Sequence, residues 1–501
     1  MKLSLSIDDI KRSYNGLKRL AQKSFKNGDL SRAIFYIYHC SVIAQQFNWI
    51  YADDEIEQLL KQIGNRIVTN EIVDNIPNPK RVVFVDDFCT SFVLAIQYID
   101  ALIASNREIL YIATQPENNG GKYKDILPIL KEKKQVQIKR IPLTIQNSKD
   151  CLLDLYKAIV DYAPSQVLLH LRPSSLSIPV LYALPPKIKT YLINLADQTF
   201  WLGAGLIDYC IEFRPFGVTV SRERRGIKPK QQLMLPYYPV VDNNPFQGFP
   251  KQCAEYGKVT IFSGGDIYKV LDDKQMYWHL VKRLLNTFPE IVFIFATKAD
   301  NIGMDFLSRF ITENHFEDRF IYTKFRSDIN EVLAHTDIFM GTCPASGSLI
   351  SQLAARNATP ILQYYYPDTP DDETEQSLCI NDTFQISYQE EELFMQEAER
   401  LIKNVEYRKQ VGVRLQKAII QPHQFNEALD YLLTTNKSPF PVETKHVDYA
   451  LLDDRWFALE KAGYISSLSY LYGLLGKKNC IRYVPKLFIK KQLNTLINTF
   501  E

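Results

Sequence analysis

The chain has 501 residues, of which 46% are hydrophobic and 23% are charged. This is the composition of an ordinary soluble protein, and the length allows two or three domains, each with its own core. The 59 basic and 57 acidic residues leave a formal net charge of only +2. Because no excess of positive charge points to nucleic acid, we expect no nucleic-acid partner.

The eight cysteines lie far apart in the sequence and form no CxxC pair. Such spacing argues against a disulfide framework and a zinc site, and it fits a reducing compartment. The first residues turn charged at Asp8-Asp9, so they lack the apolar core of a signal peptide. No run reaches the ~18 apolar residues of a membrane span. We expect a cytoplasmic protein that touches a membrane at most as a peripheral protein on its inner face.

Residues 1–77 have the apolar spacing of helices, interrupted at Gly28-Asp29. The pattern predicts a helix, a tight turn and a second helix, as in a single tetratricopeptide-type hairpin. Since stable arrays need ~3 or more such repeats, we expect residues 1–77 to form a helical cap on the next domain.

Two stretches of the chain alternate short apolar runs with helical segments, which predicts parallel sheets built from βαβ units. In residues 78–245 the apolar runs are 81–85, 109–113, 136–141, 167–170 and 190–193. After a proline-containing connector they restart in residues 250–420, at 259–262, 291–295, 320–322, 338–340 and 360–362. The predicted fold class is α/β, with two Rossmann-like domains facing a cleft and helical extensions at both ends. Ligands of such sheets bind outside the carboxyl ends of the strands.

Residues 421–501 are predicted to form a helical C-terminal extension. The stretch from Leu474 to Phe500 mixes apolar residues with basic ones at positions 477, 478, 482, 486, 490 and 491. Such a segment either docks on anionic lipid or packs against the body of the protein with its charges in water.

Two glycine-containing turns follow strands of the second predicted Rossmann-like domain. Gly264-Gly265 follows its first strand, and Ser346-Gly347-Ser348 opens a helix after the strand at 338–340. Glycines allow close approach of a ligand, and the first amides of a helix attract a diphosphate. Neither turn is a GxGxxG or Walker motif, and a serine here could simply cap the helix. Lys269 and Arg326 lie near strand ends of the same domain, where cations could reach phosphate oxygens.

The stretches 262–295 and 326–360 resemble, in residue spacing, the donor domain of the O-GlcNAc transferase family and of the similar bacterial adhesin-modifying glycosyltransferases, which have the GT-B fold. In that family a lysine of a Tyr-Lys segment and a basic residue before the second helix contact the uridine nucleotide. A glycine opens the helix that binds the diphosphate. The resemblance implies these roles for Lys269, Arg326 and Gly347.

The chain departs from the family at two places. The family's His-Thr-Thr run after the glycine is Ser348-Leu349-Ile350 here, and Leu353 stands in place of the aspartate that binds the ribose.

In the first Rossmann-like domain, the segments 193–203 and 221–226 resemble segments of uncharacterised bacterial glycosyltransferases. Asp197 follows a strand, with Asn194 and Trp201 close by in the sequence as candidate acceptor contacts. His170 ends the preceding strand. Asp197 and His170 are the candidate catalytic bases, whereas a helix cap and a core histidine are their structural alternatives.

We therefore expect a glycosyltransferase, hexosyl or N-acetylhexosaminyl, that moves a sugar from a nucleoside-diphosphate sugar, UDP-sugar favoured, to a glycan or protein acceptor. The family resemblance suggests bacterial surface polysaccharide or glycoprotein synthesis. No Asp-x-Asp pair with apolar flanks suggests a metal, so we expect no metal or other cofactor, and cations and helix amides would stabilise the leaving diphosphate. Inversion or retention stays open. The alternatives are a nucleotide-sugar epimerase of the same architecture and a non-catalytic binding or scaffold protein.

Overall fold

The structure is a computed structural model, and it describes residues 6–69, 75–88, 92–116, 123–239, 241, 244–249, 259–272, 274–297, 301–366, 373–378, 385–453, 464–486 and 488–489. The chain divides into two compact units. Unit 1 comprises residues 1–235 and 426–501, and unit 2 comprises residues 236–425. The three segments predicted as N-terminal cap, first Rossmann-like domain and C-terminal extension thus share one unit.

The described strands of unit 1 form a parallel sheet in the order β3-β2-β1-β4-β5-β6-β7. Its strands are β1 Asn78–Asp86, β2 Glu108–Ala113, β3 Val136–Arg140, β4 Pro164–His170, β5 Lys189–Ile193, β6 Tyr209–Glu212 and β7 Gln232–Met234. The connecting helices are α4 Phe92–Ala104, α5 Tyr123–Lys131, α6 Ser148–Tyr162, α7 Ile178–Leu181 and α8 Pro215–Arg225, with a 3-10 turn η2 at Pro229–Gln231. The strands predicted from sequence are all present, whereas β6 and β7 were not predicted.

Three helices precede this sheet: α1 Ile7–Lys26, α2 Leu30–Phe47 and α3 Asp54–Ile67. The predicted turn lies between the first two, where Gly28 takes a φ of +82° and the Asp29 side chain accepts a hydrogen bond from the Arg32 amide. The apolar faces of these helices join one core with side chains of the strands β1, β2, β4, β5 and β6. α3 packs closely on α7, where a Cβ at Gly64 would lie 1.8 Å from the Pro179 carbonyl oxygen.

The C-terminal part of the chain returns to unit 1 through α17, Pro422–Thr435, and ends its described part in α19, Tyr464–Tyr483. Leu475 and Cys480 of α19 are buried in the same core as α1, while Lys477 and Lys478 are exposed. The basic residues at 490 and 491 lie outside the described residues, and membrane contact stays a prediction. No described helix is long and apolar enough to cross a membrane.

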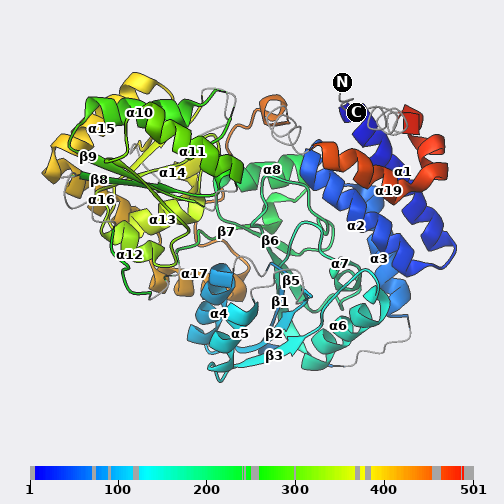
Figure 1. The fold of residues 1–501 in the computed structure, drawn as a ribbon. Coiled ribbons are helices and arrows are strands. Elements are labelled where there is room, and N and C mark those ends of the chain that lie inside the picture. Colours follow the sequence, from blue (N-terminus) through cyan, green and yellow to red (C-terminus); the bar gives the residue numbers. More distant parts are fainter. Residues whose placement is uncertain are drawn as a thin grey trace. The chain divides into compact units, whose positions relative to one another are not determined.

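Unit 2 contains a second parallel sheet, in the order β10-β9-β8-β11-β12-β13. Its strands are β8 Val259–Gly264, β9 Ile291–Ala296, β10 Phe320–Thr323, β11 Ile338–Met340, β12 Ile361–Tyr364 and β13 Ser387–Tyr388. The helices are α10 Met276–Thr287, α11 Asn301–Glu313, α12 Ile329–Ala334, α13 Ser348–Arg356, α14 Glu373–Ser377, α15 Glu391–Lys403 and α16 Val405–Ala418, with a 3-10 turn η3 at Ile267–Lys269. Figure 1 shows α10 and α11 on one face of this sheet and α12 and α13 on the other.

Candidate functional site

The strand order of unit 2 reverses between β8 and β11, which is where a doubly wound sheet opens a crevice for ligands. β8 leads into Gly265 and the 3-10 turn that ends at Lys269. β11 leads into the segment 341–347, which opens α13. Because the two strands are parallel neighbours, these segments leave the sheet at the same edge.

The predicted donor residues around Lys269 do lie together. The Lys269 Nζ atom is 3.4 Å from the Ser346 carbonyl oxygen, and it is 3.8 Å from where a Cβ at Gly347 would stand. A Cβ at Gly265 would approach the Lys269 side chain to 3.3 Å. A Cβ at Gly264, at the end of β8, would lie 2.9 Å from the Ala296 carbonyl oxygen. The backbone of both glycine-containing turns is thus closely packed, and both turns lie beside Lys269.

The start of α13 presents backbone donors to this place. Gly347 is its N-cap with extended backbone and no side-chain cap, and the Ser351 amide makes the first bond of the helix, to the Gly347 carbonyl. The amides of the first turn therefore have no intrahelical acceptor, and the helix dipole favours an anion in front of them. The Ser348 hydroxyl lies 2.9 Å from the Tyr237 hydroxyl, so this serine does not cap its own helix.

Arg326 is held elsewhere, and its predicted role as a phosphate contact is not supported by its geometry. Its guanidinium makes two 2.7 Å bonds to the Asp328 carboxylate and a 2.9 Å bond to the Gly248 carbonyl oxygen. The two bonds from Arg326 to the carboxylate lower the pKa of Asp328. The Asp328 carboxylate also accepts the Gln247 amide. Arg326 thus fastens the segment 244–249 onto the turn before α12.

In unit 1 the strand order reverses between β1 and β4, so the corresponding crevice lies at the ends of these two strands. Asp86 ends β1 and His170 ends β4, and the two residues are paired in the sheet. The His170 Nδ1 atom is 2.8 Å from Asp86 Oδ1. The other carboxylate oxygen accepts the Tyr111 hydroxyl at 2.5 Å. The carboxylate therefore orients the ring and favours the tautomer with the proton on Nδ1.

His170 is fully buried, and its Nε2 atom has no hydrogen-bond partner within the described part of the chain. The ring of Phe88 lies 5.5 Å from the imidazole, centroid to centroid. An unpaired Nε2 opposite an oriented Nδ1 is the arrangement of a general base. Access to it requires that covering side chains move aside.

Asp197, the first candidate base, occupies a place that suits a structural role. It has no exposed surface, and Arg214 binds both of its oxygens, at 2.6 and 2.9 Å. The Arg225 guanidinium donates to the Asp197 carbonyl oxygen and lies 5.0 Å from the Trp201 ring. Both carboxylate oxygens of Asp197 are engaged by the arginine and buried, so neither is presented to the hydroxyl of an acceptor.

The candidate acceptor contacts are buried as well. Asn194 is 2% exposed and donates to Glu212 and Ser221. Trp201 is 4% exposed. Burial raises the pKa of Glu212. These side chains support the loop after β5 from within, and the geometry does not place them on an acceptor surface.

Three further candidate site residues, two polar and one aromatic, are identified only from the structure. Thr297 and Thr323 follow or end neighbouring strands β9 and β10, and their hydroxyls are buried without a partner among the described residues. Phe325, two residues later, is 66% exposed. Within the described ranges, no group of three or more His, Cys, Asp or Glu residues could hold a metal.

No family model and no curated protein matches the chain. Several solved structures match its fold. Anabaena Alr3699/HepE in complex with UDP and glucose has a TM-score of 0.52 at 11% identity, covering 72% of this chain and all of that one. A putative UDP-N-acetylglucosamine 2-epimerase from Listeria monocytogenes has a TM-score of 0.50 at 9% identity, covering 74% and 100%. The O-GlcNAc transferase of Thermobaculum terrenum has a TM-score of 0.47 at 13% identity, covering 90% and 85%. The first two of these matches, with TM-scores of 0.50 or more, show that the chain has the two-domain α/β fold of GT-B proteins, as the sequence resemblance implied.

Proposed function

We propose that the chain is a glycosyltransferase that uses a nucleoside-diphosphate sugar, with UDP as the favoured nucleotide. The observation that carries the proposal is the convergence of Lys269 with the first turn of α13 at the β8/β11 crevice. A diphosphate placed there would meet one cation and several helix amides, which supplies the charge stabilisation that its departure from a sugar requires. The fold shared with HepE, which was crystallised with UDP and glucose, supports the choice of nucleotide.

The nucleobase end of the donor is proposed to lie toward the ends of β9 and β10. Strands in a sheet are ~4.8 Å apart, so β10 lies ~10 Å from β8, a span that suits a nucleoside attached to the diphosphate. The buried hydroxyls of Thr297 and Thr323 would be hydrogen-bond partners for base or ribose, and the exposed Phe325 ring would be a surface for stacking.

His170 is proposed to act as the base in an inverting transfer. Its Nε2 would accept the proton of the acceptor hydroxyl, while Asp86 stabilises the imidazolium that forms. Asp197 and Arg214 are assigned to holding the loop after β5. The acceptor is a glycan or a protein of bacterial surface-polysaccharide or glycoprotein synthesis, and the reaction is proposed to need no metal.

Thermal unfolding with nucleoside diphosphates, in the presence and absence of EDTA, tests the proposal. A ligand at 100 times its Kd should stabilise the protein by about 2.7 kcal/mol. UDP should stabilise it equally with EDTA. Unchanged melting with every diphosphate would contradict the proposal and favour the scaffold alternative. Conversion of UDP-N-acetylglucosamine to its 2-epimer without an acceptor would assign the chain as an epimerase instead.

A further inference from the structure

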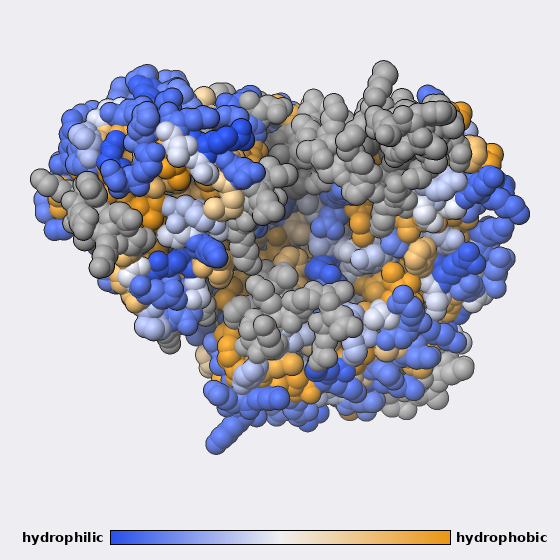
Figure 2. Space-filling model, viewed as in Figure 1, coloured by the Kyte–Doolittle hydropathy of each residue, from blue (hydrophilic) through white to orange (hydrophobic). Residues whose placement is uncertain are grey.

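A cavity of about 620 Å³ lies in unit 2 between α10 and α11, and none of the residues assigned to the donor lines it. Its size falls within the ~300–1,000 Å³ range of small-molecule sites. Figure 2 shows hydrophilic side chains over most of the surface where Figure 1 places these helices, with apolar ones between them. The cavity, called here the α10–α11 groove, is lined from both helices.

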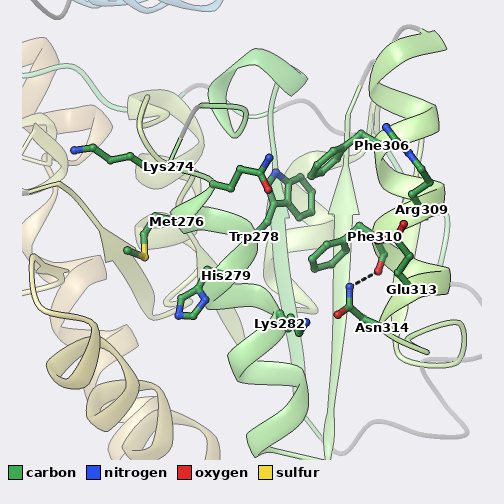
Figure 3. Close-up of a pocket in the computed structure, with 11 residues that line it drawn as sticks. Lys274, Met276, Trp278, His279, Lys282, Phe306, Arg309, Phe310, Glu313 and Asn314 are labelled. Carbon is green, nitrogen blue, oxygen red and sulfur yellow. Dashed lines mark hydrogen bonds between the residues drawn. The ribbon is translucent and has the colours of Figure 1, made fainter.

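Aromatic rings gather in the groove. Trp278 comes from α10, and Phe306 and Phe310 come from α11, with ring centroids 5.1 and 5.0 Å from the indole (Figure 3). Trp278 is 2% exposed, and its Nε1 has no hydrogen-bond partner among the residues that the structure describes. The two phenylalanines are half-buried. A flat apolar group would cover the remaining surface of the two phenylalanines, and the indole N–H is a buried donor whose partner is not found among the described residues.

The charges around these rings are mainly positive. Lys274, Lys282 and Arg309 line the groove, opposed by the carboxylate of Glu313. Lys282 and Arg309 are exposed and come from opposite helices (Figure 3). The lining therefore carries a formal excess of two positive charges, which favours an anion over a neutral or cationic ligand.

We propose that the α10–α11 groove is a second ligand site, which binds a small organic anion with a flat apolar body. The rings hold the apolar body, and the excess positive charge of the lining, to which Lys282 and Arg309 contribute from opposite helices, attracts the anionic group. The site is independent of the proposed transferase reaction, because the groove-lining residues include neither Lys269 nor any residue of the segment 341–348.

The test uses the full-length protein and two matched probes. 8-Anilinonaphthalene-1-sulfonate is a flat anion, and N-phenyl-1-naphthylamine has the same rings without the sulfonate. We expect the anion to bind with quenching of tryptophan fluorescence. The double variant Lys282→Glu/Arg309→Glu should weaken its binding at least tenfold, which corresponds to about 1.4 kcal/mol. The neutral probe should bind more weakly and respond little to the double variant.

The control is Lys409→Glu/Lys417→Glu, which reverses two exposed cations on α16 of the same unit. It should leave the affinity for the anion within about twofold of the native value. Equal affinity in both double variants, or equal affinity for the two probes in the native protein, would overturn the proposal. Thermal melting of each variant establishes that it is folded, since all four positions are on the surface.

Discussion

Arg214 grips the carboxylate of Asp197 with two hydrogen bonds, of 2.6 and 2.9 Å, at a place where Asp197 has no exposed surface. The pair joins the loop after β5 to the start of α8, which begins at Pro215. A Cβ at Gly217 would lie 3.1 Å from Asp197 and 2.5 Å from Glu212, so the first turn of α8 is packed directly on these carboxylates. The pair of Asp197 and Arg214 therefore has a structural role.

Replacing Asp197 with Ala should therefore destabilise the fold. The change leaves the Arg214 guanidinium buried without its partner, and breaking a buried pair in this way typically costs about 3–5 kcal/mol. Urea unfolding at pH 7 measures the loss. Glu406→Gln, which removes an exposed partner of Lys409, should cost less than about 0.5 kcal/mol. Equal stability of the two variants would contradict the structural role of Asp197.

The free energy of unfolding should depend on pH in part through His39. This residue of α2 is 8% exposed and lies edge-on to the rings of Phe35 and Tyr38. Burial lowers the pKa of His39 from 6.5 to about 4. Below pH 6.5 His39 is protonated in the unfolded chain but stays neutral in the folded chain. The free energy of unfolding therefore falls as the pH falls toward 4.

His39→Gln should remove this loss, which amounts to about 1–3 kcal/mol between pH 7 and pH 4. Urea unfolding of both proteins across this range gives the difference directly. His423→Gln, at an exposed position of α17, is the matched control and should leave the native pH dependence unchanged. If the curves of the native protein and His39→Gln run parallel, the buried imidazole does not titrate as inferred.

The alternation of apolar runs and helices was sufficient to predict both sheets, because fully buried parallel strands are continuous apolar segments. The strand β6 escaped prediction because it is short and ends in Glu212. The Glu212 carboxyl is buried among several partners, including Asn194, which comes from a different strand end and donates to it. A pattern of neighbouring residues in the sequence does not reveal such a partner.

Only part of the candidate site could be predicted, because contacts between distant elements do not appear in a local sequence pattern. Lys269 and Gly347 were expected to lie together because both follow strands of one sheet, and the structure brings them together. Sequence alone does not state that β1 lies beside β4, so the pairing of Asp86 with His170, 84 positions apart, was missed. The burial of Asp197 was likewise hidden, because its partner Arg214 lies on another element.

Lys269→Ala should lower kcat/KM for sugar transfer. The loss of transition-state stabilisation should be about 2–4 kcal/mol, the cost of removing one hydrogen-bond donor to a developing anion. The lysine is partly exposed and its Nζ bonds weakly to a carbonyl oxygen, so melting should barely change. Lys409→Ala, at an exposed position of α16 in the same unit, should transfer sugar at the native rate. A variant of Lys269 that unfolds, or one that retains full activity, contradicts its assignment to the diphosphate.

The final prediction concerns the proposed base. In an inverting transfer, His170→Gln removes the proton acceptor, so turnover should fall ~100-fold or more. Asp86→Asn should also slow turnover, because an amide neither stabilises the imidazolium nor fixes the tautomer of the ring. UDP affinity, measured by calorimetry, should stay at the native value in both variants. His335→Gln, at an exposed position in unit 2, is the control and should be fully active. Native turnover by both His170→Gln and Asp86→Asn would instead indicate a retaining transfer that needs no base.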